Sequence, residues 1–242
     1  MFNYIGQVIG YVNIAVLFPI LLSPAEFGLT RLITSYSVVL AQFSSIGIRR
    51  VIVRFFPFFR DVENKGHHGF LILMSAIPAL GFLVGVLIFF LFKGEIVNSQ
   101  ADSDLFGEYV FLIPLAGFLT LYFWVLDSHL KALIRTSLSS FLSNVVLKLL
   151  WLIWALLYYF KVLDLDSFML LYFSSHAFLL IIQIISLFHS GELNIQWDKQ
   201  YLRLRVVKRV IYFGFFSIID DATGVMTAHL DKIIIGSLLG LE

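Results

Sequence analysis

Seven long stretches of this 242-residue chain are almost free of charged residues, and they limit the possible folds more than any other feature. A helix that crosses a bilayer needs about 20 apolar residues, because the hydrocarbon core is about 30 Å thick and the helix rises about 1.5 Å per residue. Such long stretches are typical of membrane-spanning helices, and they exceed the length of buried strands in a soluble sheet. The sequence therefore predicts seven spans, near residues 4–22, 28–48, 69–92, 108–127, 138–160, 168–189 and 210–236.

The composition agrees with a polytopic membrane protein. Hydrophobic residues make up 60% of the chain and charged residues 14%, against about 25% charged residues in soluble domains. This balance excludes a disordered chain, a nucleic-acid-binding domain and a typical cytosolic enzyme. With no cysteine, the chain has no disulfide, no thiolate metal site and no cysteine nucleophile. The first apolar stretch has neither a basic flank nor a cleavage site, so we expect a retained helix rather than a signal peptide.

The Lys and Arg residues gather in alternate loops. Twelve of the 17 lie in the loops after the second and fourth spans and in the segment before the seventh, whereas the other loops are mainly acidic. By the positive-inside rule the basic loops are cytoplasmic, which places the N-terminus inside the cell. A seven-helix receptor or a retinal protein has the opposite orientation, so the loop charges argue against both.

The longest polar segment suggests how the chain is divided. We expect a six-helix transmembrane lobe over 1–190, a cytoplasmic inter-lobe linker over 191–209, and the first helix of a second lobe over 210–242. Basic and apolar residues are mixed at 198–209, which is either an amphipathic helix on the inner leaflet or a plain juxtamembrane segment.

Polar residues inside the spans are candidates for function, because a charge at the bilayer centre costs at least ~2.5–3.5 kcal/mol. They form stripes at helical spacing on the second span (Arg31, Ser35, Gln42, Ser45, Arg49), the fifth (Ser140, Asn144, Lys148) and the seventh (Asp220, Gly224, Thr227, Asp231, with Asp221 and Lys232 beside them). Such stripes either line a shared aqueous cavity or hold helices together by hydrogen bonds. Arg31 lies near the end of its span, where it lines the cavity or extends its charge to the interface.

The first span carries Asn3, Gly6, Gly10 and Asn13 on one face, including a GxxxG sequence. This pattern indicates close packing of two helices or, alternatively, the lining of a cavity. The histidines within the spans have no metal-ligand spacing, and the chain has no phosphate loop, nucleophile elbow or HExxH sequence. We therefore expect no catalytic residue, no cofactor and no metal.

The segment 21–61 reads LLSPAEFGLTRLITSYSVVLAQFSSIGIRRVIVRFFPFFRD. It resembles the first two spans of the bacterial polysaccharide-biosynthesis transporters, the O-antigen and exopolysaccharide flippases of the multidrug/oligosaccharidyl-lipid/polysaccharide exporter superfamily. The matching features are LSPAEFG at 22–28, the Arg31 stripe, SSIGI at 44–48 and RFFPFFRD at 54–61. The segment HLDKIIIGSLLGLE at 229–242 is similar to the seventh span of that family, and the middle of the chain matches by hydropathy alone.

The resemblance implies an all-α membrane fold of two six-helix lobes, of which this chain holds the first lobe and one further helix. We therefore expect either a fragment that lacks its C-terminal lobe or a half-size protein that pairs with a second copy.

The resemblance also implies a function, which is to move an undecaprenyl-pyrophosphate-linked oligosaccharide for lipopolysaccharide, O-antigen or exopolysaccharide across the bacterial inner membrane by alternating access. The partners would be this lipid-linked oligosaccharide and membrane lipids, with no nucleic acid and no enzymatic activity. Cationic side chains would hold pyrophosphate, amides would bond sugar hydroxyls, and acids would couple transport to protons or sodium. The cationic candidates are Lys148, Arg31, Arg49, Arg50 and Arg54. The amide candidates are Asn13, Gln42 and Asn144, and the acidic candidates are Asp220, Asp221 and Asp231.

Two other functions remain open. A drug or cation antiporter of the same superfamily would have an acid-lined cavity, whereas the basic stripes favour an anionic cargo. A non-transporting membrane scaffold in polysaccharide assembly would lack a central cleft. The basic segment 49–60 also has a simpler interpretation, as an anchor for anionic lipid headgroups.

Overall fold

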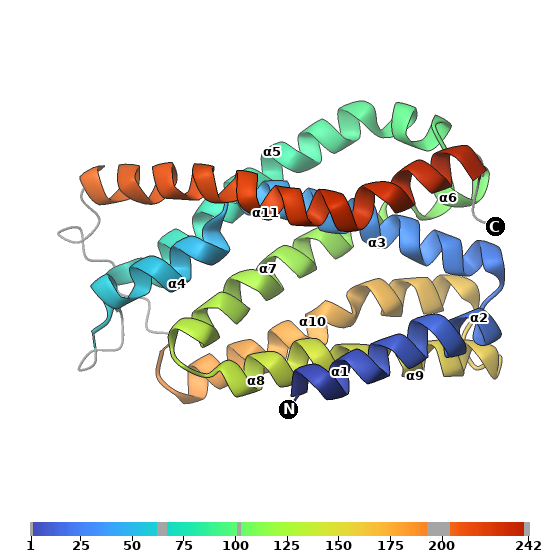
Figure 1. Cartoon of the computed structure of the whole chain (residues 1–242), viewed down its shortest axis with the longest axis horizontal. Helices are drawn as coiled ribbons and strands as arrows, with labels where there is room; N and C mark the ends of the chain where they lie inside the picture. Colours follow the sequence, from blue (N-terminus) through green and yellow to red (C-terminus); the bar gives the residue numbers. More distant parts are fainter. Residues whose placement is uncertain (1, 62–66, 101–102, 193–203, 240–242) are drawn as a thin grey trace.

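The computed structural model describes residues 2–61, 67–100, 103–192 and 204–239, and for the last helix it describes only part of the side chains. The described residues form a bundle of helices with no β-strand among them (Figure 1). In chain order the α-helices are α1 (Phe2–Tyr11), α2 (Phe18–Leu21), α3 (Pro24–Ser44), α4 (Ile48–Phe59), α5 (Phe70–Asn98), α6 (Ser103–Tyr109), α7 (Leu112–Ala132), α8 (Thr136–Phe141), α9 (Leu147–Tyr159), α10 (Leu165–His189) and α11 (Leu204–Leu239). Short π-helical segments, η1 (Val12–Leu17) and η3 (Leu142–Val146), join α1 to α2 and α8 to α9, and a 3₁₀ turn, η2 (His67–Gly69), precedes α5.

Five helical segments of the described part are long and apolar enough to cross a membrane: Phe2–Leu21, His67–Asn98, Leu112–Ala132, Thr136–Tyr159 and Leu165–His189. This confirms the prediction of an all-α membrane fold but not the count of seven spans. Of the other two predicted spans, 210–236 lies within α11, whereas 28–48 covers most of α3 and runs through the turn after Ser44 to the first residue of α4. Their sequences are less apolar, because α3 carries Arg31, Gln42 and several hydroxyl residues and α11 carries paired aspartates.

The two ends of the bundle differ in charge. The end at the left of Figure 1, here called the basic end, holds α4 and the turn from α7 to α8. These segments carry Arg49, Arg50, Arg54, Arg60, Lys131 and Arg135. The opposite end, here called the acidic end, holds the start of α3, α6 and the turn from α9 to α10. These segments carry Glu26, Asp104, Glu108, Asp164 and Asp166.

Helix α7 is the centre of the bundle. It packs against α3, α4, α5, α8 and α10, and most of its side chains are buried. The exposed faces of α1 and α5 consist largely of big apolar side chains, such as Val8 on α1 and Leu87 and Leu91 on α5. Such faces are what lipid-facing helices present to hydrocarbon.

The sequence LSPAEFG forms the start of α3. The Ser23 hydroxyl accepts a hydrogen bond from the Glu26 backbone N–H at 3.3 Å, and Glu26 Oε2 accepts one from the Ser23 N–H at 2.8 Å. This capping box, with Pro24 at the first helical position, satisfies donors that a helix start leaves unpaired. The other carboxylate oxygen of Glu26 accepts a hydrogen bond from the Tyr158 hydroxyl, which fastens the start of α3 to the end of α9.

The sequence SSIGI forms the sharp turn between α3 and α4. Ile46 and Gly47 both have positive φ angles, 50° and 65°, which end one helix and begin the next in a new direction. Helix α4 is strongly amphipathic and buries one face, consisting of Ile48, Val51, Ile52, Phe55, Phe56 and Phe59. The RFFPFFRD sequence therefore supplies the aromatic face that holds α4 against the bundle.

Helix α11 packs along α3 and α4. The ring centroids of Phe213 and Phe55 lie 5.7 Å apart, and further along α11 the His229 Nδ1 lies 3.2 Å from Ser35 Oγ. The described helices thus form one bundle rather than two lobes. Helix α11 begins at Leu204, within the predicted linker 191–209, and residues 193–203 of that linker lie outside the described part of the chain.

Candidate functional site

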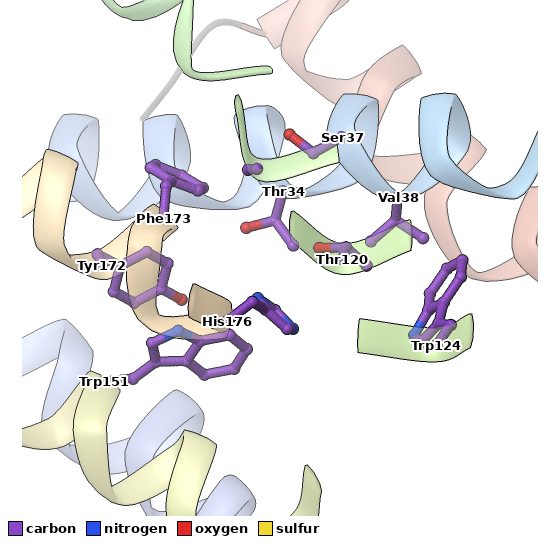
Figure 2. Close-up of a pocket in the computed structure, with 10 residues that line it drawn as sticks. Thr34, Ser37, Val38, Thr120, Trp124, Trp151, Tyr172, Phe173 and His176 are labelled. Atoms are coloured by element: carbon purple, nitrogen blue, oxygen red, sulfur yellow. The ribbon is translucent and has the colours of Figure 1, made fainter. Parts of the chain in front are cut away.

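A partly open cavity of about 200 Å³ is lined by α3, α7, α9 and α10. Its lining is mostly aromatic side chains and hydroxyl groups. The residues are Thr34, Ser37 and Val38 of α3; Ala116, Thr120 and Trp124 of α7; Trp151 of α9; and Tyr172, Phe173 and His176 of α10. Figure 2 shows Trp151 and Tyr172 on one side, Trp124 on the other and His176 between them.

The aromatic wall of the cavity has a fixed geometry. The rings of Trp151 and Tyr172 are stacked, with centroids 5.1 Å apart and planes at 17°. His176 meets Trp151 edge to face at 6.4 Å and Phe123 at 5.4 Å. Stacked and edge-to-face pairs are the arrangements that aromatic rings prefer, so the wall is held by its own packing.

Two polar groups of the lining have no hydrogen-bond partner among the described residues. They are the Ser37 hydroxyl and the Trp151 indole N–H, both buried. A buried polar group without a partner costs about 1–3 kcal/mol.

An arginine stands beside the lining at each end of the cavity. The Arg49 guanidinium lies over the Trp124 ring, 4.6 Å from its centroid. Toward the acidic end, Arg31 lies 5.1 Å from the centre of the Phe27 ring and is near enough to Tyr172 to interact electrostatically. Two of the predicted substrate-binding residues are thus next to the cavity.

The other two predicted arginines lie on the outer side of α4. Arg54 is exposed and covers the Phe213 ring of α11 at 4.4 Å, and Arg50 is exposed one turn earlier. Arg49, Arg50 and Arg54 were predicted to bind the pyrophosphate together at the cytoplasmic side, but the turn at Gly47 directs α4 away from the axis of α3. As a result, Arg49 approaches the cavity and Arg54 contacts α11.

Gln42 also lies on α3, and its side chain is completely buried. Neither its amide oxygen nor its amide nitrogen has a hydrogen-bond partner among the described residues. It lies one turn beyond Val38, toward the basic end. The structure therefore leaves Gln42 a candidate for contact with a bound ligand but does not place it in the cavity lining.

The remaining predicted substrate residues form a seam between the first and fifth predicted spans. Lys148 Nζ donates a hydrogen bond to the Gly6 carbonyl at 2.6 Å, and Asn13 Nδ2 donates one to the Lys148 carbonyl at 2.8 Å. Asn144 Nδ2 donates to Asn3 Oδ1 at 3.1 Å. The two polar stripes thus face each other instead of a shared cavity.

Glycine makes this seam possible. A Cβ atom at Gly6 would lie 2.4 Å from Asn144 Cβ, and one at Gly10 would lie 2.8 Å from Lys148 Nζ. The interpretation of GxxxG as a close-packing sequence is therefore confirmed.

We expect Lys148→Met to destabilise the docking of α1. The variant keeps most of the side-chain volume but removes a hydrogen bond from a charged donor, which is worth about 1.5–3 kcal/mol. The midpoint of thermal unfolding in detergent should fall by several degrees. Lys161→Met, at an exposed position after α9, serves as the control and should leave the midpoint unchanged. An equal effect of the two substitutions would contradict the structural role of Lys148.

The predicted ion-coupling residues Asp220, Asp221 and Asp231 belong to α11. Their side chains lie outside the described part of the structure, so this role stays a prediction. In the described part, no group of three or more His, Asp and Glu side chains is placed to hold a metal ion.

At the acidic end a wider hollow of about 420 Å³ lies between α6 and α10. There the Tyr109 hydroxyl donates a hydrogen bond to Asp166 Oδ1 at 2.5 Å. Burial, and then the bond to Asp166, raise the pKa of Tyr109 above its usual range, so the phenol stays protonated at physiological pH. The contact ties α6 to the start of α10.

The aromatic and hydroxyl lining of the cavity was not predicted from the sequence. A weak signal was present, since Thr120 and Trp124, like Tyr172 and His176, are four residues apart and share a helix face. Apolar and aromatic stripes are common in every span, however, and nothing local shows which of them meet. Comparison of the chain with known protein families, with curated proteins and with solved structures finds no match.

Proposed function

We propose that the protein transports a lipid-linked oligosaccharide across the bacterial inner membrane, and that the central cavity binds a sugar unit of this cargo. The observation that carries the proposal is the cavity lining, in which stacked aromatic rings stand opposite hydroxyl groups. The sequence resemblance to polysaccharide flippases supports the same cargo.

The lining matches the chemistry of a sugar. A pyranose ring has an apolar C–H face that packs on an aromatic ring and a rim of hydroxyls that need hydrogen-bond partners. Trp151 and Tyr172 offer the aromatic face, and Thr34, Ser37 and Thr120 are the hydroxyl residues of the lining. A few placed polar groups in a mostly apolar pocket are typical of specific ligand sites.

The arginines suit the anionic part of the cargo. Guanidinium groups bind phosphates in bidentate fashion and remain charged at all physiological pH values. In the proposed orientation the basic end faces the cytoplasm. Arg50 and Arg54 then meet the pyrophosphate at the inner membrane surface, and Arg49 lies between that surface and the cavity.

Transport requires the cavity to open to each side in turn. In the proposed mechanism the described bundle forms one wall of the pathway, and a C-terminal lobe or a second copy of the chain forms the other.

We expect Trp151→Ala to reduce transport at least about tenfold, which corresponds to the loss of about 1.4 kcal/mol of interaction with the sugar. Ser37→Ala should have a smaller effect in the same direction. The measurement is the rate at which a fluorescent undecaprenyl-pyrophosphate oligosaccharide crosses the membrane of liposomes that contain the purified protein.

Tyr159→Ala is the matched control, because Tyr159 is an exposed aromatic residue on the same helix α9. It should transport within about twofold of the wild type. Equal rates for Trp151→Ala and the wild type would contradict a sugar site in the cavity. A wild-type protein that moves a lipophilic drug cation but no glycolipid would support the antiporter, and one that moves neither would support the scaffold.

A further inference from the structure

Helix α4 turns a stripe of basic and apolar side chains outward at the basic end of the bundle. Its opposite face is buried, and none of its residues is acidic. The exposed positions are Arg50, Val53, Arg54, Pro57 and Phe58. Their spacing of i, i+3, i+4, i+7 and i+8 places them on one side of the helix. This side therefore combines positive charge with apolar groups, of which the Phe58 side chain is 76% exposed.

The first turns of α11 continue this stripe, and Figure 1 shows them together with α4 at the basic end. The two helices run antiparallel, because Gly47 lies next to Ser217, whereas Phe55, further along α4, packs on Phe213. Arg209, one turn before Phe213, thus lies toward the end of α4. The exposed side chains of this part of α11 are Lys208, Arg209, Ile211, Tyr212, Phe215 and Phe216.

Arg54 joins the two helices while it stays exposed. Its guanidinium covers the Phe213 ring of α11 at 4.4 Å. This contact attracts the cation to the π-face of the ring and uses no N–H hydrogen bond. The N–H groups of Arg54 can therefore still bind the oxygens of a phosphate.

The acidic side chains described at the basic end contact other partners. These contacts join Asp127 to Lys131 at 2.6 Å, Glu192 to His67 at 2.5 Å and Asp61 to His68 at 3.9 Å. Among the residues that the structure describes, no ion pair involves Arg54, Arg60, Lys208 or Arg209. The described acids thus leave the positive charge of these four side chains unbalanced.

We propose that the exposed residues of α4 and of 208–216 on α11, here called the α4–α11 surface, bind the headgroups of anionic phospholipids. Arginine and lysine side chains would contact the headgroup phosphates, while Phe58, Tyr212 and Phe216 would lie among the upper parts of the acyl chains. Each Lys or Arg close to an anionic membrane surface strengthens association about fivefold.

The position of the α4–α11 surface favours a lipid over a soluble partner. The segment His67–Asn98, which follows α4 in the chain, is long and apolar enough to cross a membrane, so α4 lies at a membrane boundary. Aromatic side chains are enriched at this boundary, and here Tyr212 and Phe216 form an exposed pair with ring centroids 4.8 Å apart. A surface of this composition suits headgroups on one side and acyl chains on the other.

The inference goes beyond the transport of a cargo. Bulk phospholipid and the pyrophosphate of a lipid-linked cargo share the chemistry of a phosphate oxygen, and the source proposed here is the bulk phospholipid. It would hold the basic end at the membrane surface whichever molecule the protein transports.

A fluorescent label on the α4–α11 surface tests the proposal. Because the chain has no cysteine, Phe58→Cys gives a single labelling site on this surface. Leu91→Cys, at an 81% exposed position near the acidic end of α5, gives a matched site elsewhere. The labelled full chain is placed in liposomes of phosphatidylcholine and phosphatidylglycerol without cargo, and quenching is measured with either lipid carrying a nitroxide near its headgroup. At Phe58→Cys we expect a preference for phosphatidylglycerol of at least about fivefold, and at Leu91→Cys none.

Charge substitutions show whether the preference is electrostatic. Lys208→Gln with Arg209→Gln, added to Phe58→Cys, should lower the preference severalfold. Lys93→Gln with Lys161→Gln, at exposed positions toward the acidic end, is the matched control and should leave it within about twofold. Raising the salt from about 0.1 M to about 1 M shortens the screening length from about 10 Å to about 3 Å and should also remove the preference.

Arg54 needs its own control, because it also contacts α11. Arg54→Gln should weaken the preference, whereas Arg54→Lys keeps the charge and should retain most of it. Equal losses in the two variants would show that Arg54 acts through packing and would remove it from the lipid site.

Equal quenching by the two lipids at Phe58→Cys would overturn the proposal and favour an acidic protein as the occupant. A preference that survives both high salt and the loss of Lys208 and Arg209 would overturn it as well. Since these liposomes contain no cargo, a negative result leaves the transport function standing. A protein that prefers phosphatidylglycerol at this surface but moves no glycolipid would instead show that the transport function is wrong and the lipid site is right.

Discussion

Gly47→Val is expected to detach α11 from α3 and α4. Gly47 has a φ of +65°, and a Cβ atom there would lie 2.2 Å from the Gly214 carbonyl oxygen of α11. A left-handed conformation costs a residue other than glycine about 1–3 kcal/mol. Overpacking against the α11 backbone adds about 1–3 kcal/mol. Because the clash is with backbone rather than with a flexible side chain, α11 must move away.

Because the chain has no cysteine, an introduced pair of cysteines can measure whether α11 stays packed against α3. With Ser35→Cys and His229→Cys introduced together, a short bifunctional thiol reagent should cross-link α3 to α11, since Ser35 Oγ and His229 Nδ1 lie 3.2 Å apart. Adding Gly47→Val should reduce the cross-linked fraction severalfold. Gly224→Val is the control on the same helix, because no atom lies within 4 Å of a Cβ at Gly224. Full cross-linking in the Gly47→Val protein would show that the close approach of α4 and α11 is wrong.

Gly6→Val is expected to separate α1 from η3 and α9. A Cβ at Gly6 would lie 2.5 Å from the Asn144 carbonyl oxygen as well as close to its Cβ, so the clash again involves backbone. The displacement would also break the hydrogen bond from Lys148 to the Gly6 carbonyl. We expect a loss of unfolding free energy of about 1–3 kcal/mol from overpacking, together with the net value of that hydrogen bond.

Cross-linking of Asn3→Cys to Asn144→Cys by the same bifunctional thiol reagent measures this seam, because Asn144 Nδ2 and Asn3 Oδ1 lie 3.1 Å apart. The cross-link should form readily in the parent and fall severalfold when Gly6→Val is added. Gly94→Val on α5, where a new side chain meets no atom within 4 Å, should leave it intact. Equal cross-linking with Gly6→Val and Gly94→Val would refute the close packing of α1.

Local features of the fold could be predicted from the sequence. Hydropathy located the five described segments that are long and apolar enough to cross a membrane, since burial in lipid requires a continuous apolar segment. The Ser23–Glu26 pair is visible as a capping box at a spacing of three residues, and the glycines of the first span indicated close packing. The segments that carry the resemblance, LSPAEFG, SSIGI and RFFPFFRD, proved to have local structural roles as a helix start, a turn and an aromatic helix face.

The sequence did not predict which helix faces pack against each other. The stripe of Asn144 and Lys148 is equally suited to water, to a ligand or to another helix, and only the position of α1 decides among them. The cavity takes its residues from four helices far apart in the sequence. Asp127 fell at the last residue of a predicted span, where a charge normally extends to the interface, whereas α7 continues beyond it and buries the carboxylate.

The position of α3 links two surfaces that are otherwise far apart. One side of this helix contributes Thr34, Ser37 and Val38 to the cavity wall, and another side carries Ser35, which contacts His229 of α11. Because a helix held by its own hydrogen bonds rotates or slides as a unit, it cannot adjust one side and leave the other unchanged. Helix α3 therefore belongs both to the cavity wall and to the contact with α11, so a displacement of α11 would be transmitted to the cavity.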